Sequence, residues 1–445
     1  MECSAARPNE LLHPIERFAS VRSIKSKTAR WIRAVSALAA LAGGLVATRH
    51  AAAEVTLVKS DPWEVYTSGR VNVFFGLAVG QGMPKAQLRG GGVESALDEE
   101  PSTDPNAQGK LFKMRVHSGF VPNVLSVGVR RKMGESTLRA QLSVWGTLET
   151  LSQRKFEAVA ADFREGYLEA DGAWGTFTAG RFGSLFSRGI TETDFMYGHG
   201  YGVGFWGGTV GQPGPAAGLI GFGVLANSFS PGMMYTTPKL GGVRLALGIF
   251  DPVSMAGSWD GSRTARPEAE LTYDLGSPDS FFKLHLYANG AYQKVYQGPL
   301  DSTVRGVGGG FRTEIGHFHL GAGGHTGKGL GLYYALEGSA ADTLGQGLPF
   351  RTADGYSIFA QYVLGAVDLN ASFGQSRIHL LDLDLQPDRA DLHPIQTQTG
   401  ISAGVVYHLN ESFHLDLDYL RAQFRWYGGY KQDLNYFNTG ATLTW

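Results

Sequence analysis

The stretch EVYTSGRVNVFFGL, residues Glu64–Leu77, decides the fold because its side chains change character at every second position. The apolar set is Val65, Val71, Val73, Phe75 and Leu77. The polar set on the other parity is Glu64, Ser68, Arg70 and Asn72. Residues two apart share one face of a β-strand, so the pattern predicts a strand with one apolar face and one polar face.

The same alternation recurs along the chain, and no amphipathic helical stretch competes with it. It is clearest in Val124–Lys132, Leu138–Leu148, Phe281–Asn289, Val367–Gln375 and Phe413–Leu420. With loose boundaries it predicts sixteen strands, at residues 63–79, 121–132, 136–148, 162–171, 174–182, 230–239, 242–250, 265–275, 280–292, 303–314, 316–325, 352–364, 366–376, 396–408, 412–423 and 434–445.

An even number of strands, joined alternately by short turns and long connections, is typical of a transmembrane antiparallel β-barrel. Closure gives every backbone N–H and C=O a partner, which lipid requires. A large soluble β-sandwich or β-helix is the alternative. It would turn its apolar residues inward and would not need a charged residue opposite the apolar face in strand after strand. The all-β barrel is therefore the favoured fold for residues 54–445.

Composition narrows the functional class. The chain has 445 residues, with 62 Gly, 11% aromatic and 18% charged residues and a formal net charge of −1. No basic arm or basic patch interleaved with aromatics occurs after residue 53, which argues against a nucleic-acid partner.

Residues 1–53 are predicted to be a signal peptide, with a lead from Met1 to Ser20 that can be a misassigned start. A basic region from Arg22 to Arg33 precedes the apolar stretch Ala34–Ala47, and the small residues suited to cleavage end at Ala53. Removing residues 1–53 takes away 8 Lys and Arg and 3 Asp and Glu, which leaves 31 against 37, a net charge of −6. The only cysteine, Cys3, lies in this segment, so residues 54–445 have no thiol.

No stretch indicates an enzyme, a cofactor or a metal site. Gly321–Gly329 (GAGGHTGKG) departs from a phosphate-binding loop at Ala322 and at Gly329. His317, His319 and His325 have no carboxylate or thiol to complete a ligand set. Ordinary Ser and His positions give no spacing distinctive of a lipase. The acidic stretch Asp382–Pro394 is either a Ca²⁺ site or, as we favour, a solvated external loop.

The long segment Gly183–Ser228 interrupts the strand pattern. It is rich in Gly, contains Pro213 and Pro215, and carries only three charged residues, Arg188, Glu192 and Asp194. Its aromatic content is unlike that of a solvated linker. The aromatic residues are Phe186, Phe195, Tyr197, Tyr201, Phe205, Trp206 and Phe222. We therefore expect the segment to pack against the inside of the barrel and to have a function.

The last stretch, NYFNTGATLTW (Asn435–Trp445), puts Phe437, Leu443 and Trp445 on one face and ends on an aromatic residue. Here the chain resembles the general porins of Gram-negative outer membranes. The resemblance also covers residues 66–77, 125–145, 163–182 and 228–250. It implies an outer-membrane location, an inward-folded long third loop at residues 183–228, and a homotrimer. It also implies that Phe437, Leu443 and Trp445 form the signal read by the barrel-insertion machinery, where the family more usually ends in Phe.

The charged residues on the polar faces of the predicted strands suggest where the permeation path lies. If the apolar parity faces lipid, Arg70, Arg130, Lys132 and Arg139 point into the lumen. By resemblance, Arg70 and Arg181 stand where the family keeps basic constriction residues, opposite acids of the third loop, here Glu192 and Asp194. We place Arg130 and Arg139 in the same constriction. The alternative for each arginine is a lumenal salt bridge without effect on selectivity.

The resulting functional hypothesis is a water-filled channel for passive diffusion of small hydrophilic solutes and ions. The alternative is a substrate-selective channel in which Tyr197, Tyr201 and Trp206 form an aromatic track for a sugar or similar solute. One departure bears on both hypotheses. The loop has MYGHGYGVGFWGG where the best-studied enteric members have a Pro-Glu-Phe-Gly-Gly segment. A third class, an adhesive or structural barrel without a pore, would show no channels.

Overall fold

The structure is a computed structural model. It describes residues 54–86, 88–89, 99–100, 108–121, 123–146, 162–197, 202, 216–252, 263–333, 350–387 and 393–445. The predicted signal peptide, residues 1–53, lies outside the described residues.

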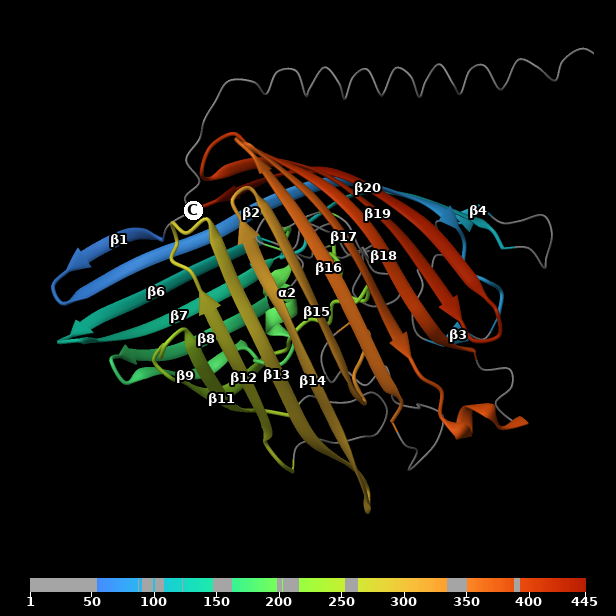
Figure 1. The fold of residues 1–445 in the computed structure, drawn as a ribbon, viewed down its shortest axis with the longest axis horizontal. Coiled ribbons are helices and arrows are strands. Elements are labelled where there is room, and N and C mark those ends of the chain that lie inside the picture. Colours follow the sequence, from blue (N-terminus) through green and yellow to red (C-terminus); the bar gives the residue numbers. More distant parts are fainter. Residues whose placement is uncertain are drawn as a thin grey trace, which may run out of the picture. The chain divides into compact units, whose positions relative to one another are not determined.

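Antiparallel strands form one closed barrel with sixteen strand positions (Figure 1). Each strand position pairs with the next one around the barrel, and β2 pairs with β20 to close the ring. The strands are β2 (Trp63–Gln81), β5 (Lys110–His117), β6 (Asn123–Met133), β7 (Ser136–Gly146), β8 (Asp162–Gly172), β9 (Gly175–Gly183), β10 (Phe229–Thr236), β11 (Val243–Phe250), β12 (Arg266–Leu275), β13 (Phe282–Gln297), β14 (Leu300–Ile315), β15 (Phe318–Lys328), β16 (Thr352–Leu364), β17 (Val367–Ile378), β18 (His393–His408), β19 (Phe413–Trp426) and β20 (Lys431–Thr444). The prediction of a sixteen-stranded antiparallel barrel is confirmed.

The second strand position differs from the prediction, because two strands share it. β6 pairs with the first half of β2 and β5 with the second half. The side chain of Asn72 forms hydrogen bonds with the backbone that connects β5 to β6. Its Oδ1 accepts from Gly119 N (2.8 Å), and its Nδ2 donates to Val121 O (3.0 Å). Val121 has a φ of 55°. One polar side chain thus satisfies backbone groups that the interrupted ladder leaves unpaired.

Three short strands were not predicted. β1 (Val55–Ser60) forms a hairpin with β2 and pairs with residues 63–67 of it. β3 (Leu88–Arg89) runs parallel to the start of β18, and β4 (Glu99–Glu100) pairs with β5.

The two faces of the barrel wall are as the sequence predicts. On β19, Leu415 and Leu417 are exposed, whereas Asp416 and Asp418, which alternate with them, are buried. On β7, Leu142 is 51% exposed while its neighbour Ser143 is fully buried. Apolar side chains therefore face lipid and polar ones face the interior.

Turns of two residues join β6 to β7, β8 to β9, β14 to β15 and β16 to β17, all at one end of the barrel. Gly134, Gly316 and Gly365 in these turns have φ near 60°, which L side chains rarely adopt. Short turns mark the periplasmic end of such a barrel. Among the described residues, no helix has the length and apolar character needed to cross a membrane.

Candidate pore constriction

The segment between β9 and β10 begins with the short helix α2 (Arg188–Thr193), which contacts β13, β14 and β15 (Figure 1). Glycines make this contact close. A Cβ at Gly189 would lie 2.3 Å from the Tyr287 ring, and one at Gly323 would lie 2.1 Å from the Tyr287 hydroxyl. Real Cβ atoms do not approach so closely, so both positions require glycine as long as α2 rests on this wall.

Charged groups surround α2. Arg188 pairs with Glu270 of β12, a carboxylate that is only 3% exposed, and lies 3.8 Å from Glu192 one helical turn later. The Glu192 side chain is itself 56% exposed. Although this side chain is partly exposed, the protein around α2 displaces part of the surrounding water and thereby raises the pKa of Glu192, an increase that Arg188 partly opposes. Arg312 of β14 stacks over the Phe195 ring at 4.7 Å, and its Nη1 donates to the Glu192 carbonyl (3.4 Å).

Backbone N–H groups of the segment bond to inward side chains on three strands. Phe186 N donates to Glu268 Oε2 of β12 (2.8 Å). Gly202 N donates to Asp418 Oδ2 of β19 (2.9 Å). Gly223 N donates to Ser376 Oγ of β17 (2.9 Å). Because four strands of the barrel separate β12 from β17, the described parts of the segment contact the interior face in two separate regions, one at β12 and one at β17–β19.

The end of the segment, residues 216–226, packs into an apolar cluster on the interior face. The Phe222 ring lies 5.8 Å from the ring of Phe424 on β19, and Phe222 O accepts from Ser357 Oγ (3.2 Å). The cluster members from residues 216–226 are Ala216, Leu219, Ile220, Phe222, Val224, Leu225 and Ala226; those from the wall include Phe359, Ile378, Leu420, Phe424, Trp426, Leu434 and Tyr436. This cluster was not predicted from the sequence.

The two acids assigned to the loop have different surroundings. Glu192 is exposed, as a group that acts on permeating ions must be. Asp194 is 4% exposed, and its Oδ1 accepts from Met196 N (3.0 Å). Of the two, Asp194 therefore has an evident structural part in shaping the turn after α2.

Arg70 shares its parity on β2 with the buried Asn72 and Phe74, so it points inward as predicted. Arg130 and Arg139 also lie on the inward parity, but they form a separate cluster. Arg130 bonds Glu54 (2.6 Å) and Glu64 (2.7 Å), and Arg139 bonds Glu169 (2.9 Å).

The cluster of Arg130 and Arg139 lies near the periplasmic turn at Gly134, four residues beyond Arg130. Among the described residues, no contact joins it to α2. The structure therefore does not bring these two arginines to the loop acids. The register of β2 against β6, which places Glu64 opposite Arg130, is the physical reason.

Arg181 requires a correction. It shares its parity on β9 with the exposed Phe177, whereas Thr178 and Phe182 on the other parity are buried. Arg181 is exposed, and its Nε donates to Arg164 O (3.2 Å). It thus points away from the interior. The sequence around it, TFTAGRF, carries apolar residues on both parities, so alternation alone did not settle its direction.

The terminal residues assigned to membrane insertion lie at the closing seam. Phe437 and Leu443 face outward and are each 46% exposed. Trp445 exchanges two backbone hydrogen bonds with Gly69, of 2.8 and 3.1 Å. Tyr201 and Trp206 of the proposed aromatic track lie outside the described residues, whereas Tyr197 packs edge-on against Phe120 at 5.6 Å.

Sequence reasoning missed three acids that hold the segment: Glu268, Glu270 and Asp418. Their inward direction is visible in the sequence, yet their partners Phe186, Arg188 and Gly202 lie more than eighty residues away along the chain. In the described part of the chain, no three His, Cys, Asp or Glu side chains are grouped to hold a metal ion.

A closed sixteen-stranded barrel with lipid-facing apolar residues is the architecture of an outer-membrane channel. The model of the Gram-negative porin family matches residues 34–442, and the chain belongs to that family. The protein is an outer-membrane channel for diffusion of small solutes.

Two solved structures illustrate the likeness of fold. The outer-membrane channel DcaP of Acinetobacter baumannii aligns with a TM-score of 0.59 and 12% identity, over 88% of this chain and 100% of that one. The anion-selective porin from Comamonas acidovorans aligns with a TM-score of 0.56 and 14% identity, over 86% and 100%. No curated protein sequence matches the chain.

Proposed function

We propose that the segment Gly183–Ser228 narrows the channel and that its exposed charges set the ion preference. One observation carries the proposal. Phe186, Gly202 and Gly223, spread along the segment, donate backbone hydrogen bonds to inward side chains of β12, β19 and β17. A segment bonded at these three places occupies cross-section that solutes would otherwise use.

The charges that act on ions are Glu192 on α2 and Arg70 on β2. Two unit charges about 8 Å apart interact by roughly 0.5 kcal/mol in bulk water and roughly 2 kcal/mol at an effective dielectric near 20. Reversing one charge changes such an interaction by twice its value. Since a tenfold change in a partition ratio takes about 1.4 kcal/mol, Glu192→Lys should favour anions several-fold, and Arg70→Glu should favour cations.

Reversal potentials of the channel in a salt gradient test this proposal. The matched control is Glu135→Lys, which reverses an exposed carboxylate in the periplasmic turn between β6 and β7. The shifts should shrink at 1 M salt, where the screening length is about 3 Å. Unchanged reversal potentials for both lumenal variants, with the barrel correctly folded, would contradict the assignment.

A substrate-selective channel is the alternative, with Tyr197, Tyr201 and Trp206 as a stacking track. Saturable block of conductance by a candidate sugar, relieved by Tyr197→Ala, would support selectivity. Conductance that is linear in solute concentration would support general diffusion. We favour general diffusion, without any covalent step, because Tyr197 is the single member of the track with a described position and it is engaged by Phe120.

Three further proposals rest on the family resemblance. Residues 1–53 act as a cleaved signal peptide, the chain associates as a homotrimer, and Phe437, Leu443 and Trp445 form the signal for the barrel-insertion machinery. The exposed outward faces of Phe437 and Leu443, next to the terminal Trp445, support the last of these. N-terminal sequencing and chemical crosslinking of protein extracted from the outer membrane test the first two.

A further inference from the structure

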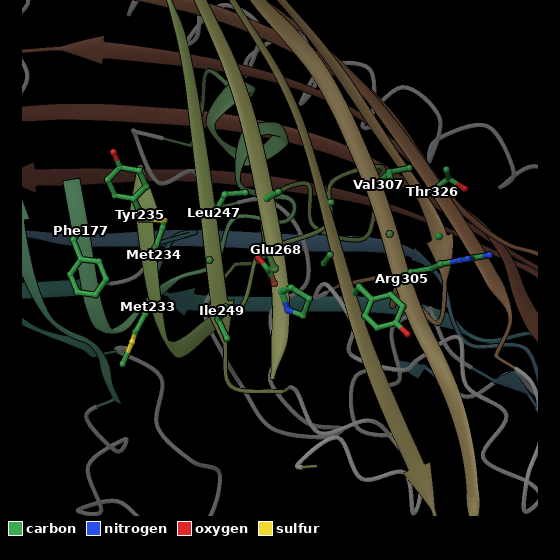
Figure 2. A pocket seen from close by; sticks show the side chains of 18 residues that line it. Phe177, Met233, Met234, Tyr235, Leu247, Ile249, Glu268, Arg305, Val307 and Thr326 are labelled. Carbon is green, nitrogen blue, oxygen red and sulfur yellow. The ribbon is translucent and has the colours of Figure 1, made fainter. Parts of the chain in front are cut away.

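The outward surface of β10–β15 carries a groove of about 850 Å³ (Figure 2). Most of its lining residues project from the lipid-facing side and are apolar, whereas Met234, Glu268 and Ala291 point inward. The lipid-facing ones include Met233 (62% exposed), Leu247 (51%), Ile249 (60%) and Val307 (60%). Small residues, Gly248, Ala269 and Gly290, form its floor. A concave apolar surface within the lipid-facing wall fits an acyl chain.

One end of the groove is cationic. Arg305 of β14 lines it and lies directly opposite Lys328 of β15 in the strand register, so both side chains point outward. Among the described residues, neither cation makes an ion pair or a hydrogen bond. The acid nearest in register, Asp354, stands opposite Thr326 and bonds His379 instead. Two like charges directly opposite on a sheet are destabilising unless an anion lies between them.

The position of this pair along the strands identifies the membrane level. Arg305 is ten residues from Ile315, where β14 meets its periplasmic turn, and Lys328 is ten residues from Phe318. A strand that rises about 3.4 Å per residue and is tilted by about 40° climbs roughly 26 Å in ten residues, about the height of the apolar band. The cations therefore lie at the external border of the bilayer.

The apolar part of the groove lies deeper in the membrane than Arg305 and Lys328. Leu247 is only four residues from the periplasmic start of β11, and Met233 is three residues from the end of β10. Figure 2 shows Arg305 at one end of the groove and Phe177 and Met233 at the other. A lipid with its head group at Arg305 would thus direct an acyl chain toward the middle of the membrane.

We propose that this groove binds one lipid of the outer leaflet with a net anionic, phosphate-bearing head group, with the phosphate between Arg305 and Lys328 and an acyl chain along the apolar floor. Clustered Lys and Arg at a membrane surface recognise anionic head groups, and arginine binds phosphate with two parallel hydrogen bonds. The acyl chain of the bound lipid gains little free energy by moving from bulk lipid to the groove, since the surrounding lipid tails are equally apolar. The head group therefore supplies the selectivity, and the floor orients the chain. The inference requires only the outer-membrane location and is independent of the proposed constriction.

Native mass spectrometry of the folded, detergent-solubilised protein tests the proposal with two probes, diphosphoryl lipid A and phosphatidylcholine. We expect lipid A to bind at least tenfold more tightly, and R305Q/K328Q to abolish that preference. Arg131→Gln is the matched control, because Arg131 is an exposed cation over the Trp63 ring near the periplasmic end. It should leave the preference intact.

A second variant separates a lipid site from other occupants. Ala269→Phe adds an apolar side chain to the groove floor on a lipid-facing position, where the barrel tolerates it. It should weaken binding of lipid A but leave the binding of a short-chain phosphate ester unchanged. An unchanged lipid preference in R305Q/K328Q would overturn the proposal. So would an Ala269→Phe variant that dissociates oligomers while binding lipid A normally, because the groove would then be an interface between copies of the chain.

Discussion

Phe222→Ala should loosen the end of the segment Gly183–Ser228 without unfolding the barrel. Phe222 is fully buried, packs on Phe424, and covers Gly400, where a Cβ would lie 2.8 Å from the Phe222 side chain. Its side chain makes no contact with lipid. The barrel ladder runs through backbone bonds that the substitution leaves intact.

The expected magnitude follows from the size of the removed side chain. Replacing a buried Phe by Ala costs about 3–5 kcal/mol, and each 1.4 kcal/mol is a factor of ten in an equilibrium. The ratio of detached to attached segment should therefore rise roughly 100-fold to 3000-fold. If the attached state is favoured by only a few kcal/mol in the native protein, detachment becomes frequent enough to observe.

Single-channel recording in planar bilayers is the appropriate assay, because a segment that leaves the wall changes the open cross-section in discrete steps. Phe222→Ala should show frequent transitions between conductance levels and faster cleavage of the segment by protease added to the folded protein. Phe437→Ala is the matched control, since it removes the same side chain from the lipid-facing side of β20. If Phe222→Ala shows no added transitions between conductance levels and is cleaved by protease no faster than the unsubstituted protein, the view that this cluster holds the segment is refuted.

The other predictions concern the wall, the terminus and pH. Leu417→Arg should lower the yield of heat-modifiable barrel, because a cation near the bilayer midplane costs about 2–4 kcal/mol, whereas Asp416→Asn on the inward parity should assemble; equal yields would mean that the faces are reversed. Deletion of Trp445 should reduce outer-membrane levels and leave exported protein in the periplasm, and undiminished insertion would place the signal elsewhere. The pKa of Glu192 is raised, so as the pH falls this carboxylate should lose its charge at a higher pH than an ordinary Glu. The cation preference of the channel should therefore decline in mild acid. Glu192→Gln should lack this decline, and a pH profile shared by both proteins would assign the titration to another group.

The sequence was sufficient for the barrel because alternation is a local signal that membrane burial enforces in every strand. Leu415, Asp416, Leu417 and Asp418 have the faces that their parity predicts. The sequence was insufficient at the position where two strands, β5 and β6, replace a single continuous strand. At the break between β5 and β6, the backbone is bonded by Asn72, which lies 47 and 49 residues earlier in the chain.

The constriction was harder to predict because it depends on register and on contacts across the barrel. Arg130 has the expected direction, but the register of β2 and β6 gives it Glu64 as a partner rather than a loop acid. Arg181 lies in a stretch that is apolar on both parities. Parity therefore predicts whether a side chain faces the interior, and it does not predict which neighbour the side chain will meet.

One strand nevertheless contained a sign of the internal cluster. Along β19 the outward residues are apolar up to Tyr419 and then become Arg421, Gln423 and Arg425. The inward residues change the opposite way, from polar ones at positions 414–418 to Leu420, Ala422, Phe424 and Trp426. The outward change marks the point where the strand leaves the apolar band. The inward change has no such explanation, since water fills the lumen at that level unless protein does. Buried aromatics on an inward parity require an apolar partner inside the barrel, and the aromatic segment Gly183–Ser228 supplies one in Phe222.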